Sequence, residues 1–229
     1  MSLPERQAEL VATHREIQAA DLPYVLVGGW AVSAFQTRFT TDIDAVIPET
    51  SLDDYEALLG DRGYEKEFET DVSNQYEGRM VQFSKAIGEN EVTFEALVGA
   101  IRCRQTDAEW SYRYLHEHST VASLDVAEDL EGRIPEPSLL FALKLHSGRM
   151  ADTRDLMIIS TRADFDRIER HIHRGDPARL DDQIADVVER LTDESFEDSF
   201  KGVFQQGELP ADAVNELVAF LTDQRERLP

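Results

Sequence analysis

The chain has 229 residues, which is enough to bury a sizeable hydrophobic core in one large or two small domains. Its 46 acidic and 23 basic residues give a net charge of −23, and such a surface repels duplex DNA unless basic residues gather locally. The only cysteine, Cys103, excludes an intrachain disulfide and fits a reducing cytosol. Residues 1–23 lack the apolar core of a signal peptide, and no run of about 18 apolar residues could cross a membrane, so we expect a cytoplasmic protein.

Lysine is scarce among the basic residues. The lysines are Lys66, Lys85, Lys144 and Lys201, and every other basic residue is an arginine. A surface rich in acids and poor in lysine is typical of halophilic proteins from salt-accumulating archaea, in which salt screens the self-repulsion. An ordinary acidic protein that works at low salt is the alternative.

Hydrophobic spacing and turn residues predict a mixed first half of the chain. Leu10, Val11 and Ile17 recur at helical spacing and predict a helix over 4–20 that ends before Pro23. The remaining predicted elements of this half are a buried strand over 24–27 that ends at Gly28-Gly29, a short helix over 30–39, a strand over 42–48, a helix over 51–59, a hairpin of strands 79–86 and 91–98, a helix over 106–118, and strands near 121–124 and near Arg133.

Pro135 and Pro137 mark a boundary, beyond which only helical patterns occur. The predicted helices cover residues 138–148, 152–160, 164–174, 178–192 and 211–225. The sequence therefore predicts an α/β domain over residues 1–135 and a helical C-terminal domain over 136–229.

Two aspartates in the predicted strand 42–48 form the first part of a candidate site. Residues two apart in a strand point to the same face, so Asp42 and Asp44 share one face and the apolar Ile43 and Ala45 take the other. Two carboxylates roughly 7 Å apart repel each other in a partly buried place, and a divalent cation relieves that repulsion. Oxygen ligands of this kind suit Mg²⁺ or Mn²⁺.

Glu95 and a glycine pair extend the candidate site. Glu95 stands in the middle of the predicted strand 91–98 between Phe94 and Ala96, which suits a third metal ligand, although an edge or merely solvated glutamate would look the same. Gly28-Gly29 permits close backbone approach to a phosphate. Arg38 and Thr40 lie just before Asp42, where a guanidinium would meet phosphate oxygens.

Composition offers a simpler explanation for the paired acids. About one residue in five is acidic, so two acids at this spacing arise by chance, as in Glu65 and Glu67. Against chance, an ionised carboxylate within an apolar strand costs free energy unless it is paired or binds a metal. We therefore interpret Asp42 and Asp44 as functional, while an unrelated acidic α/β protein with a coincidental pair is the alternative.

The stretch VGGWAVSAFQTRFTTDIDAVI, residues 27–47, resembles the signature of the nucleotidyltransferase superfamily, whose fold is that of the DNA polymerase beta palm. Its matching residues are Gly28, Gly29, Asp42 and Asp44. The local R-x-T-x-D-I-D from Arg38 is similar to a branch of small prokaryotic enzymes that includes the AbiEii-type toxins. A second stretch, residues 135–159, supports that branch through Lys144, Arg149, Arg154 and Asp155.

The resemblance implies an α+β fold, with a nucleotidyltransferase-like mixed β-sheet that has helices packed on one face, followed by an all-helical C-terminal region. It also implies an Mg²⁺- or Mn²⁺-dependent enzyme that transfers an NMP from an NTP to an acceptor such as RNA, protein or a small molecule. Gly28 and Gly29 would contact the triphosphate, Asp42 and Asp44 would hold the metal, and Glu95 would orient or deprotonate the acceptor hydroxyl. Lys144 would meet phosphates, Arg149, Arg154 and Asp155 would lie near phosphate or acceptor, and a toxin-like member would pair with a cognate antitoxin.

Departures from the family pattern point to an alternative function. Glu95 stands where aspartate is commoner, and Ile158 replaces an acid often found three residues after Asp155. A catalytically degenerate relative that binds nucleotides or other proteins is therefore the second hypothesis.

The basic residues of 144–179 allow two interpretations. Eight basic and six acidic side chains give this stretch a charge of +2, which suits either an RNA- or triphosphate-binding groove or ion pairs on solvated helices. Trp30, Trp110 and Cys103 are expected to be structural. His171 and His173 do not share a helical face, which argues against a zinc site.

Overall fold

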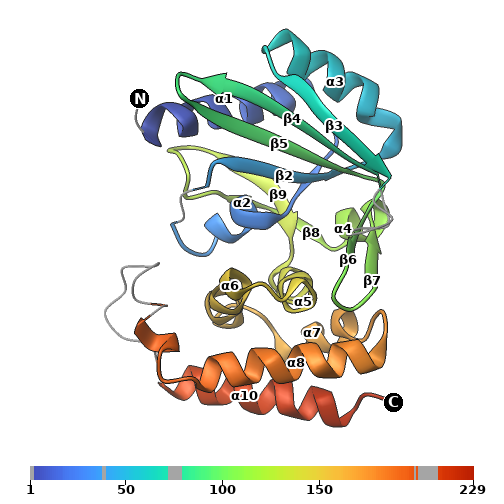
Figure 1. Cartoon of the computed structure of the whole chain (residues 1–229), viewed down its shortest axis with the longest axis vertical. Helices are drawn as coiled ribbons and strands as arrows, with labels where there is room; N and C mark the ends of the chain where they lie inside the picture. Colours follow the sequence, from blue (N-terminus) through green and yellow to red (C-terminus); the bar gives the residue numbers. More distant parts are fainter. Residues whose placement is uncertain (1–2, 38–39, 72–78, 199, 201–210) are drawn as a thin grey trace. The chain divides into compact units, whose positions relative to one another are not determined.

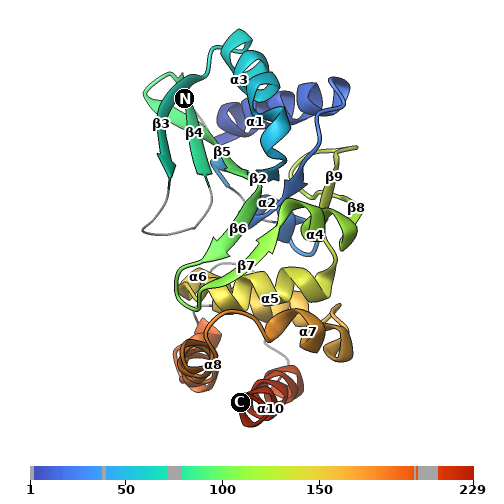
Figure 2. The same ribbon diagram turned by 90° about the vertical axis from the view of Figure 1, so that its right-hand side faces the viewer.

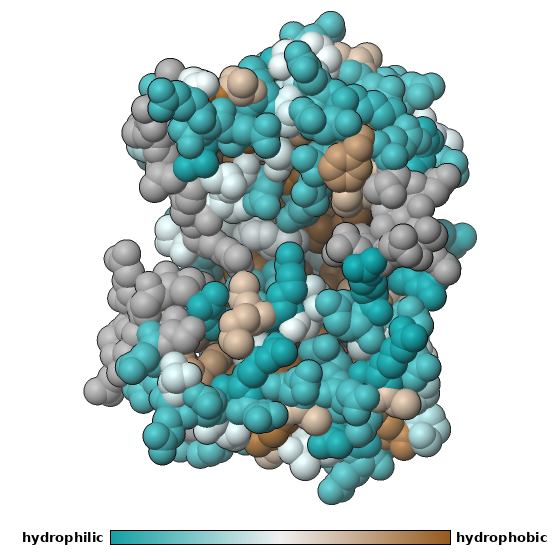
Figure 3. Space-filling model, viewed as in Figure 1, coloured by the Kyte–Doolittle hydropathy of each residue, from teal (hydrophilic) through white to brown (hydrophobic). Residues whose placement is uncertain are grey.

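The structure, a computed structural model, describes residues 3–37, 40–71, 79–198, 200 and 211–229. These residues form two compact units. The first unit comprises Met1–Arg102 and Trp110–Pro135, and the second comprises Cys103–Glu109 and Glu136–Pro229. Hydrophilic residues cover most of the visible surface of each unit, as the high content of charged residues leads one to expect (Figure 3).

The elements up to residue 135 include both helices and strands. They are α1 (Leu3–Ala19), β1 (Val25–Leu26), α2 (Gly28–Ser33), β2 (Asp42–Ile47), the 3-10 helix η1 (Glu49–Ser51), α3 (Leu52–Asp61), β3 (Glu65–Asp71), β4 (Arg79–Ile87), β5 (Asn90–Val98), β6 (Ala100–Cys103), β7 (Ala108–Ser111), α4 (Tyr112–Glu117), β8 (Ser119–Ser123) and β9 (Glu131–Pro135). The turn between β6 and β7 belongs to the second unit.

A five-stranded mixed sheet forms the centre of the first unit, in the order β1-β2-β5-β4-β3 (Figure 1). Strands β2 and β5 pair in parallel, and every other pair in this sheet is antiparallel. The parallel pair joins segments about 50 residues apart, because α3 and the strands β3 and β4 lie between them in the sequence. The predicted hairpin 79–86/91–98 is confirmed as β4 and β5.

Helices α1 and α3 cover one face of this sheet (Figures 1 and 2). The side chains that β2 and β5 direct to this face are apolar, and Ile43 and Phe94 are at most 1% exposed. Tyr55 of α3 stacks on Phe94 with ring centroids 5.6 Å apart. Because side chains alternate along a strand, the opposite face of the same strands receives Asp42, Asp44 and Glu95.

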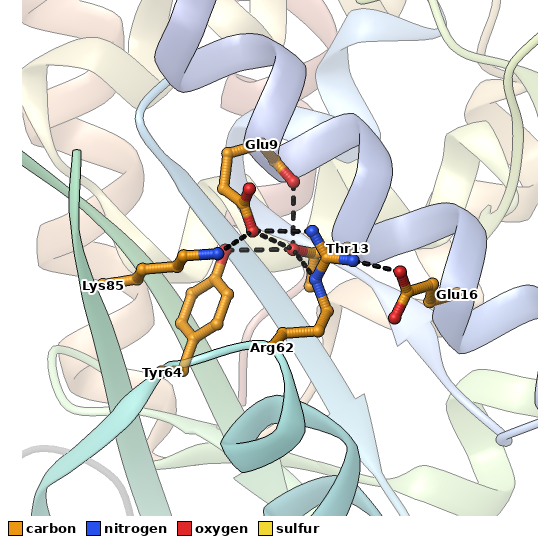
Figure 4. A network of polar contacts seen from close by, with 6 residues as sticks. All are labelled: Glu9, Thr13, Glu16, Arg62, Tyr64 and Lys85. Atoms are coloured by element: carbon orange, nitrogen blue, oxygen red, sulfur yellow. Dashed lines mark hydrogen bonds and ion pairs between the residues drawn. The ribbon is translucent and has the colours of Figure 1, made fainter.

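A polar network ties α1 to the end of α3 and to β4 (Figure 4). The Glu9 carboxylate accepts hydrogen bonds from Arg62 Nη2 at 2.7 Å and from Lys85 Nζ at 2.9 Å. Arg62 Nε also donates to the Thr13 hydroxyl, which lies 3.0 Å from the hydroxyl of Tyr64. Burial raises the pKa of Glu9, but Lys85 and Arg62 outweigh that effect and lower it below its usual value. The network therefore fastens the helical layer to the sheet with matched charges.

Two predicted helices of the first half are wrong in part. Residues 106–118 were expected to form one helix, but residues 108–111 form β7 and only Tyr112–Glu117 is helical. The burial of Ala108 and Trp110 alternates with the exposure of Glu109 and Ser111, which is the two-residue period of a strand. The helix expected over 30–39 begins earlier, at Gly28, and ends at Ser33. The edge strand β3 was not predicted, because its sequence EKEFETD is mostly acidic.

After residue 136, every described element of the second unit is a helix. These are α5 (Pro137–Ser147), α6 (Met150–Ser160), α7 (Phe165–Ile172), α8 (Pro177–Thr192) and α10 (Ala211–Glu226). Pro137 occupies the first turn of α5, and Gly148 ends that helix in the left-handed conformation with φ of +63°. Phe165 of α7 and Phe220 of α10 stack with centroids 4.5 Å apart.

The predicted fold class is confirmed: the protein is α+β, with a mixed sheet that carries helices on one face and a helical C-terminal region. Trp30 and Trp110 are 1% and 0% exposed, as expected for structural residues. Among the helices in the described part of the chain, none combines the length and the apolar character that a membrane crossing demands.

Candidate active site

Three acidic side chains occupy one face of two neighbouring strands. In the parallel pair of β2 and β5, Asp44 lies opposite Glu95, and Asp42 lies opposite Thr93. Residues that are opposite each other in a ladder point to the same face, about 4.8 Å apart. The register therefore brings Asp42, Asp44 and Glu95 together, and all three are partly exposed, whereas their apolar neighbours in the same strands are buried.

Gly28 lies directly against Asp44. The backbone N–H of Val27 donates to the Asp44 carbonyl at 2.9 Å, which holds the start of α2 beside β2. Gly28 has φ of +58°, and a Cβ atom there would lie 2.7 Å from Asp44 Cγ and closer still to Oδ2. Only glycine satisfies both the backbone conformation and this close approach. No side chain caps the backbone of α2 at Val27.

Thr40 connects the glycine turn to the other aspartate. Its hydroxyl donates a hydrogen bond to Asp42 Oδ1, and a Cβ atom on Gly29 would lie 3.1 Å from the same Oγ1. Thr40 therefore orients the Asp42 carboxylate and fills the space over Gly29. Arg38, the predicted phosphate ligand, lies outside the described residues.

The three carboxylates suit a divalent cation in their donor chemistry. They offer only hard oxygen ligands, which Mg²⁺ and Mn²⁺ prefer over nitrogen or sulfur. Two of them sit side by side across one strand pair, where their mutual repulsion would favour a bound cation. The lack of a side chain at Gly28 lets the Asp44 carboxylate lie directly against the backbone of the glycine turn.

Lys144, in the second unit, lies within a buried ion-pair cluster. Its side chain is 5% exposed, and Nζ lies 2.8 Å from Asp152 Oδ1 and 2.7 Å from Asp155 Oδ2. Burial alone would lower the pKa of Lys144, but Asp155 and Asp152 raise it above its usual value. In this structure the ammonium is therefore engaged by two aspartates, and its predicted phosphate contact stays a prediction.

Asp152 is a central residue of this cluster that the sequence analysis did not single out. Burial raises the pKa of Asp152, but Lys144 and Arg149 outweigh it and lower the pKa from 3.8 to about 2. Arg149 Nε lies 2.9 Å from Asp152 Oδ2, and the arginine side chain is 64% exposed. The sequence signal that could have identified Asp152 is its position three residues after Arg149 at the start of a helix, which is the spacing of a capping box.

The basic stretch 144–179 supplies many intramolecular ion pairs. Besides Lys144 and Arg149, Arg167 lies 3.6 Å from Glu136, and Arg179 lies 2.8 Å from Asp107. For these residues, the contacts support the interpretation of the stretch as ion pairs on solvated helices. Arg154 lines a cavity of about 580 Å³ in the second unit, together with Met150, Arg190 and Phe196.

Cys103 is poorly suited to act as a nucleophile. It is 2% exposed, and burial raises its thiol pKa to about 12, so the reactive thiolate is scarce at neutral pH. The burial of Cys103 therefore agrees with the structural role that the sequence predicted.

The sequence matches no protein-family model and no curated protein, whereas the fold resembles solved structures. The antibiotic-resistance factor ANT(2'')-Ia aligns with a TM-score of 0.53 and 15% identity over 75% of this chain and 91% of its own. The lincosamide antibiotic adenylyltransferase LnuA has a TM-score of 0.47 and 17% identity, covering 68% of this chain and 97% of its own. JHP933 from Helicobacter pylori has a TM-score of 0.48 and 16% identity, covering 99% of this chain and 93% of its own.

These likenesses concern the fold, and they do not single out the AbiEii-type branch. With its mixed sheet and helical C-terminal region, this chain has the nucleotidyltransferase fold that its sequence predicted.

Proposed function

We propose that the protein is a metal-dependent nucleotidyltransferase that moves an NMP from an NTP to an acceptor hydroxyl. The observation that carries the proposal is the pairing of Asp44 with Glu95 across the parallel strands, with Gly28 packed against the Asp44 carboxylate. Accessible carboxylates beside a glycine turn are what an enzyme needs to handle a triphosphate.

Each group has a distinct role in this proposal. The backbone at Gly28 and Gly29 receives the triphosphate, and Asp42, Asp44 and Glu95 are the residues that would hold Mg²⁺ or Mn²⁺. The cation, when bound, supplies positive charge that stabilises the attacking and leaving oxygens. Thr40 keeps the Asp42 carboxylate oriented.

The chemistry is an in-line displacement at the α-phosphorus. The acceptor oxygen forms a bond to that phosphorus, and the bond to the bridging oxygen of the β-phosphate breaks, so pyrophosphate leaves with the electron pair. Glu95 orients the acceptor hydroxyl and accepts its proton. The net result is an acceptor that carries an NMP.

Binding and transfer can be measured separately. Titration of ATP, GTP, CTP and UTP with Mg²⁺ in molar KCl measures binding, because high salt screens the charge of −23. Incubation with α-labelled NTPs and separated RNA, protein and small-molecule fractions then identifies the labelled acceptor. We expect a measurable heat of binding for at least one NTP, and label transfer that releases pyrophosphate. The absence of both results would contradict the proposal.

A degenerate nucleotide-binding or interaction module is the second candidate. Three features favour it. Glu95 stands where aspartate is commoner, the buried Ile158 stands where an acid is often found, and Lys144 is engaged by two aspartates. This candidate expects nucleotide binding without label transfer. The motif resemblance to AbiEii-type toxins adds a toxin-like form of the first proposal, in which the label enters RNA or protein and a cognate antitoxin suppresses the transfer.

A further inference from the structure

Phe68 is an exposed aromatic residue on the same sheet face as the carboxylates. Its register partner in β4 is Gln82, the partner of Gln82 in β5 is Glu95, and the partner of Glu95 in β2 is Asp44. One row across the sheet therefore reads Asp44, Glu95, Gln82, Phe68. Phe68 is 43% exposed, and it is the sole aromatic among the large hydrophobic residues that are exposed in the described part of the chain.

The local structure of β3 explains why Phe68 points away from the helices. The register between β3 and β4 shifts between Lys66 and Phe68, so the bulge inserts Glu67 as an extra residue. Lys66 is on the helical side, where Nζ lies 2.8 Å from Glu56 of α3. Glu67 is on the carboxylate side, where it accepts a hydrogen bond from Ser84. The bulge thus presents Phe68 to the face of the candidate active site.

We propose that Phe68 and Gln82 form the acceptor subsite, and that the acceptor is a small, non-anionic hydroxyl compound with a flat ring. This inference rests on the proposed function. Gly28 and Gly29 flank β2 on the side of β1, so the triphosphate lies there, whereas β5, β4 and β3 extend to the other side of Asp44. An acceptor whose hydroxyl meets Glu95 therefore extends over Gln82 toward Phe68.

Size and charge define the acceptor class. Phe68 is two strands beyond Glu95, about 10 Å away at ordinary strand spacing, which is the length of a two-ring molecule. The ring of Phe68 offers a stacking surface, and the Gln82 amide offers one donor and one acceptor group for a polar substituent. Glu67, and Glu65 in register with Ser84, add negative charge beside Phe68, which repels the phosphates of RNA.

A pair of glycosides tests the subsite without requiring catalysis. Phenyl β-D-glucopyranoside and methyl β-D-glucopyranoside differ only in the group that could stack on Phe68. Affinity is measured by ligand-observed NMR in molar KCl with Mg²⁺ and a non-hydrolysable NTP analogue. The wild-type chain is expected to bind the phenyl glycoside roughly tenfold more tightly than the methyl glycoside.

Variants assign that preference to Phe68. Phe68→Ala should abolish the preference, while Phe68→Tyr and the control Val121→Ala, at another exposed apolar position, should retain it. Equal affinity of the wild-type chain for both glycosides, including no binding of either, would overturn the inference, as would a preference that survives Phe68→Ala.

Affinity for the NTP analogue should be the same in Phe68→Ala as in the wild type. A loss of that affinity would show that the ring contacts the nucleotide, which would also overturn the inference. A failure of the proposed function is distinguishable, because it would show as a lack of NTP binding in the wild-type chain.

Discussion

Two groups of carboxylates in this protein have opposite surroundings. Asp152 and Asp155, in the second unit, are at most 1% exposed and share the ammonium of Lys144 at 2.7–2.8 Å. Asp42, Asp44 and Glu95, in the first unit, are partly exposed on one sheet face and lie beside a glycine turn. The first group is paired with charges of the chain itself, and the second group is partly exposed to solvent. Burial and the shared ammonium make the first group part of the folded core, whereas the second group is the candidate site of the proposed function.

The largest expected effect is on the accessible group. Under the proposed function Asp44 would hold the metal, so Asp44→Asn should reduce label transfer roughly 1000-fold or more. The measurement is the initial rate with α-labelled NTP. Asp53→Asn on the exposed side of α3 is the matched control and should keep full activity. Undiminished transfer by Asp44→Asn would remove this residue from the mechanism.

The buried group should respond in stability. Lys144→Met leaves two aspartates buried without their shared cation and is expected to cost about 3–5 kcal/mol of unfolding free energy. Denaturant titration measures this loss. Arg113→Met removes an exposed ion pair with Glu117 and should leave stability almost unchanged, because solvent screens that pair. Similar losses in the two variants would show that the Lys144 cluster contributes no more to stability than an exposed ion pair.

Acid should weaken the buried group in a defined window. Because the pKa of Asp152 is lowered from 3.8 to about 2 on folding, its contribution is complete above pH 3.8 and disappears as pH falls toward 2. The expected loss is about 2 kcal/mol. Unfolding free energy measured between about pH 5 and about pH 2 should fall less steeply with acid in Asp152→Asn than in the wild type. Identical slopes would show that Asp152 does not titrate as inferred.

The glycine turn gives a smaller effect that connects structure with activity. Gly28→Ala places a methyl group against the Asp44 carboxylate at a positive φ and should cost about 1–3 kcal/mol of stability while it lowers transfer. Gly60→Ala is the control, because no atom lies within 4 Å of a Cβ there and alanine favours the helix α3. Melting temperature and transfer rate report the two effects. A Gly28→Ala protein with full stability and activity would refute the close-approach argument.

Local sequence determined the parts of this protein that depend on neighbouring residues. Alternation along 42–47 placed Asp42 and Asp44 on one face, and the glycine pair predicted the turn that packs against them. The proline boundary and the helical spacing predicted the helical C-terminal region. These features follow from backbone conformation and periodicity, which act over a few residues.

The tertiary structure decided the contacts between distant segments. The pairing of Asp44 with Glu95 depends on a parallel ladder between β2 and β5. The sequence of either strand alone predicts neither its partner strand nor the register. Lys144 is buried and pairs with Asp152 and Asp155, because a buried ammonium needs an opposite charge. A bulge in an unpredicted edge strand brought Phe68 onto the face of the candidate active site. Strand pairing and burial minimise the free energy of the whole chain, so these contacts are fixed only when the chain is folded.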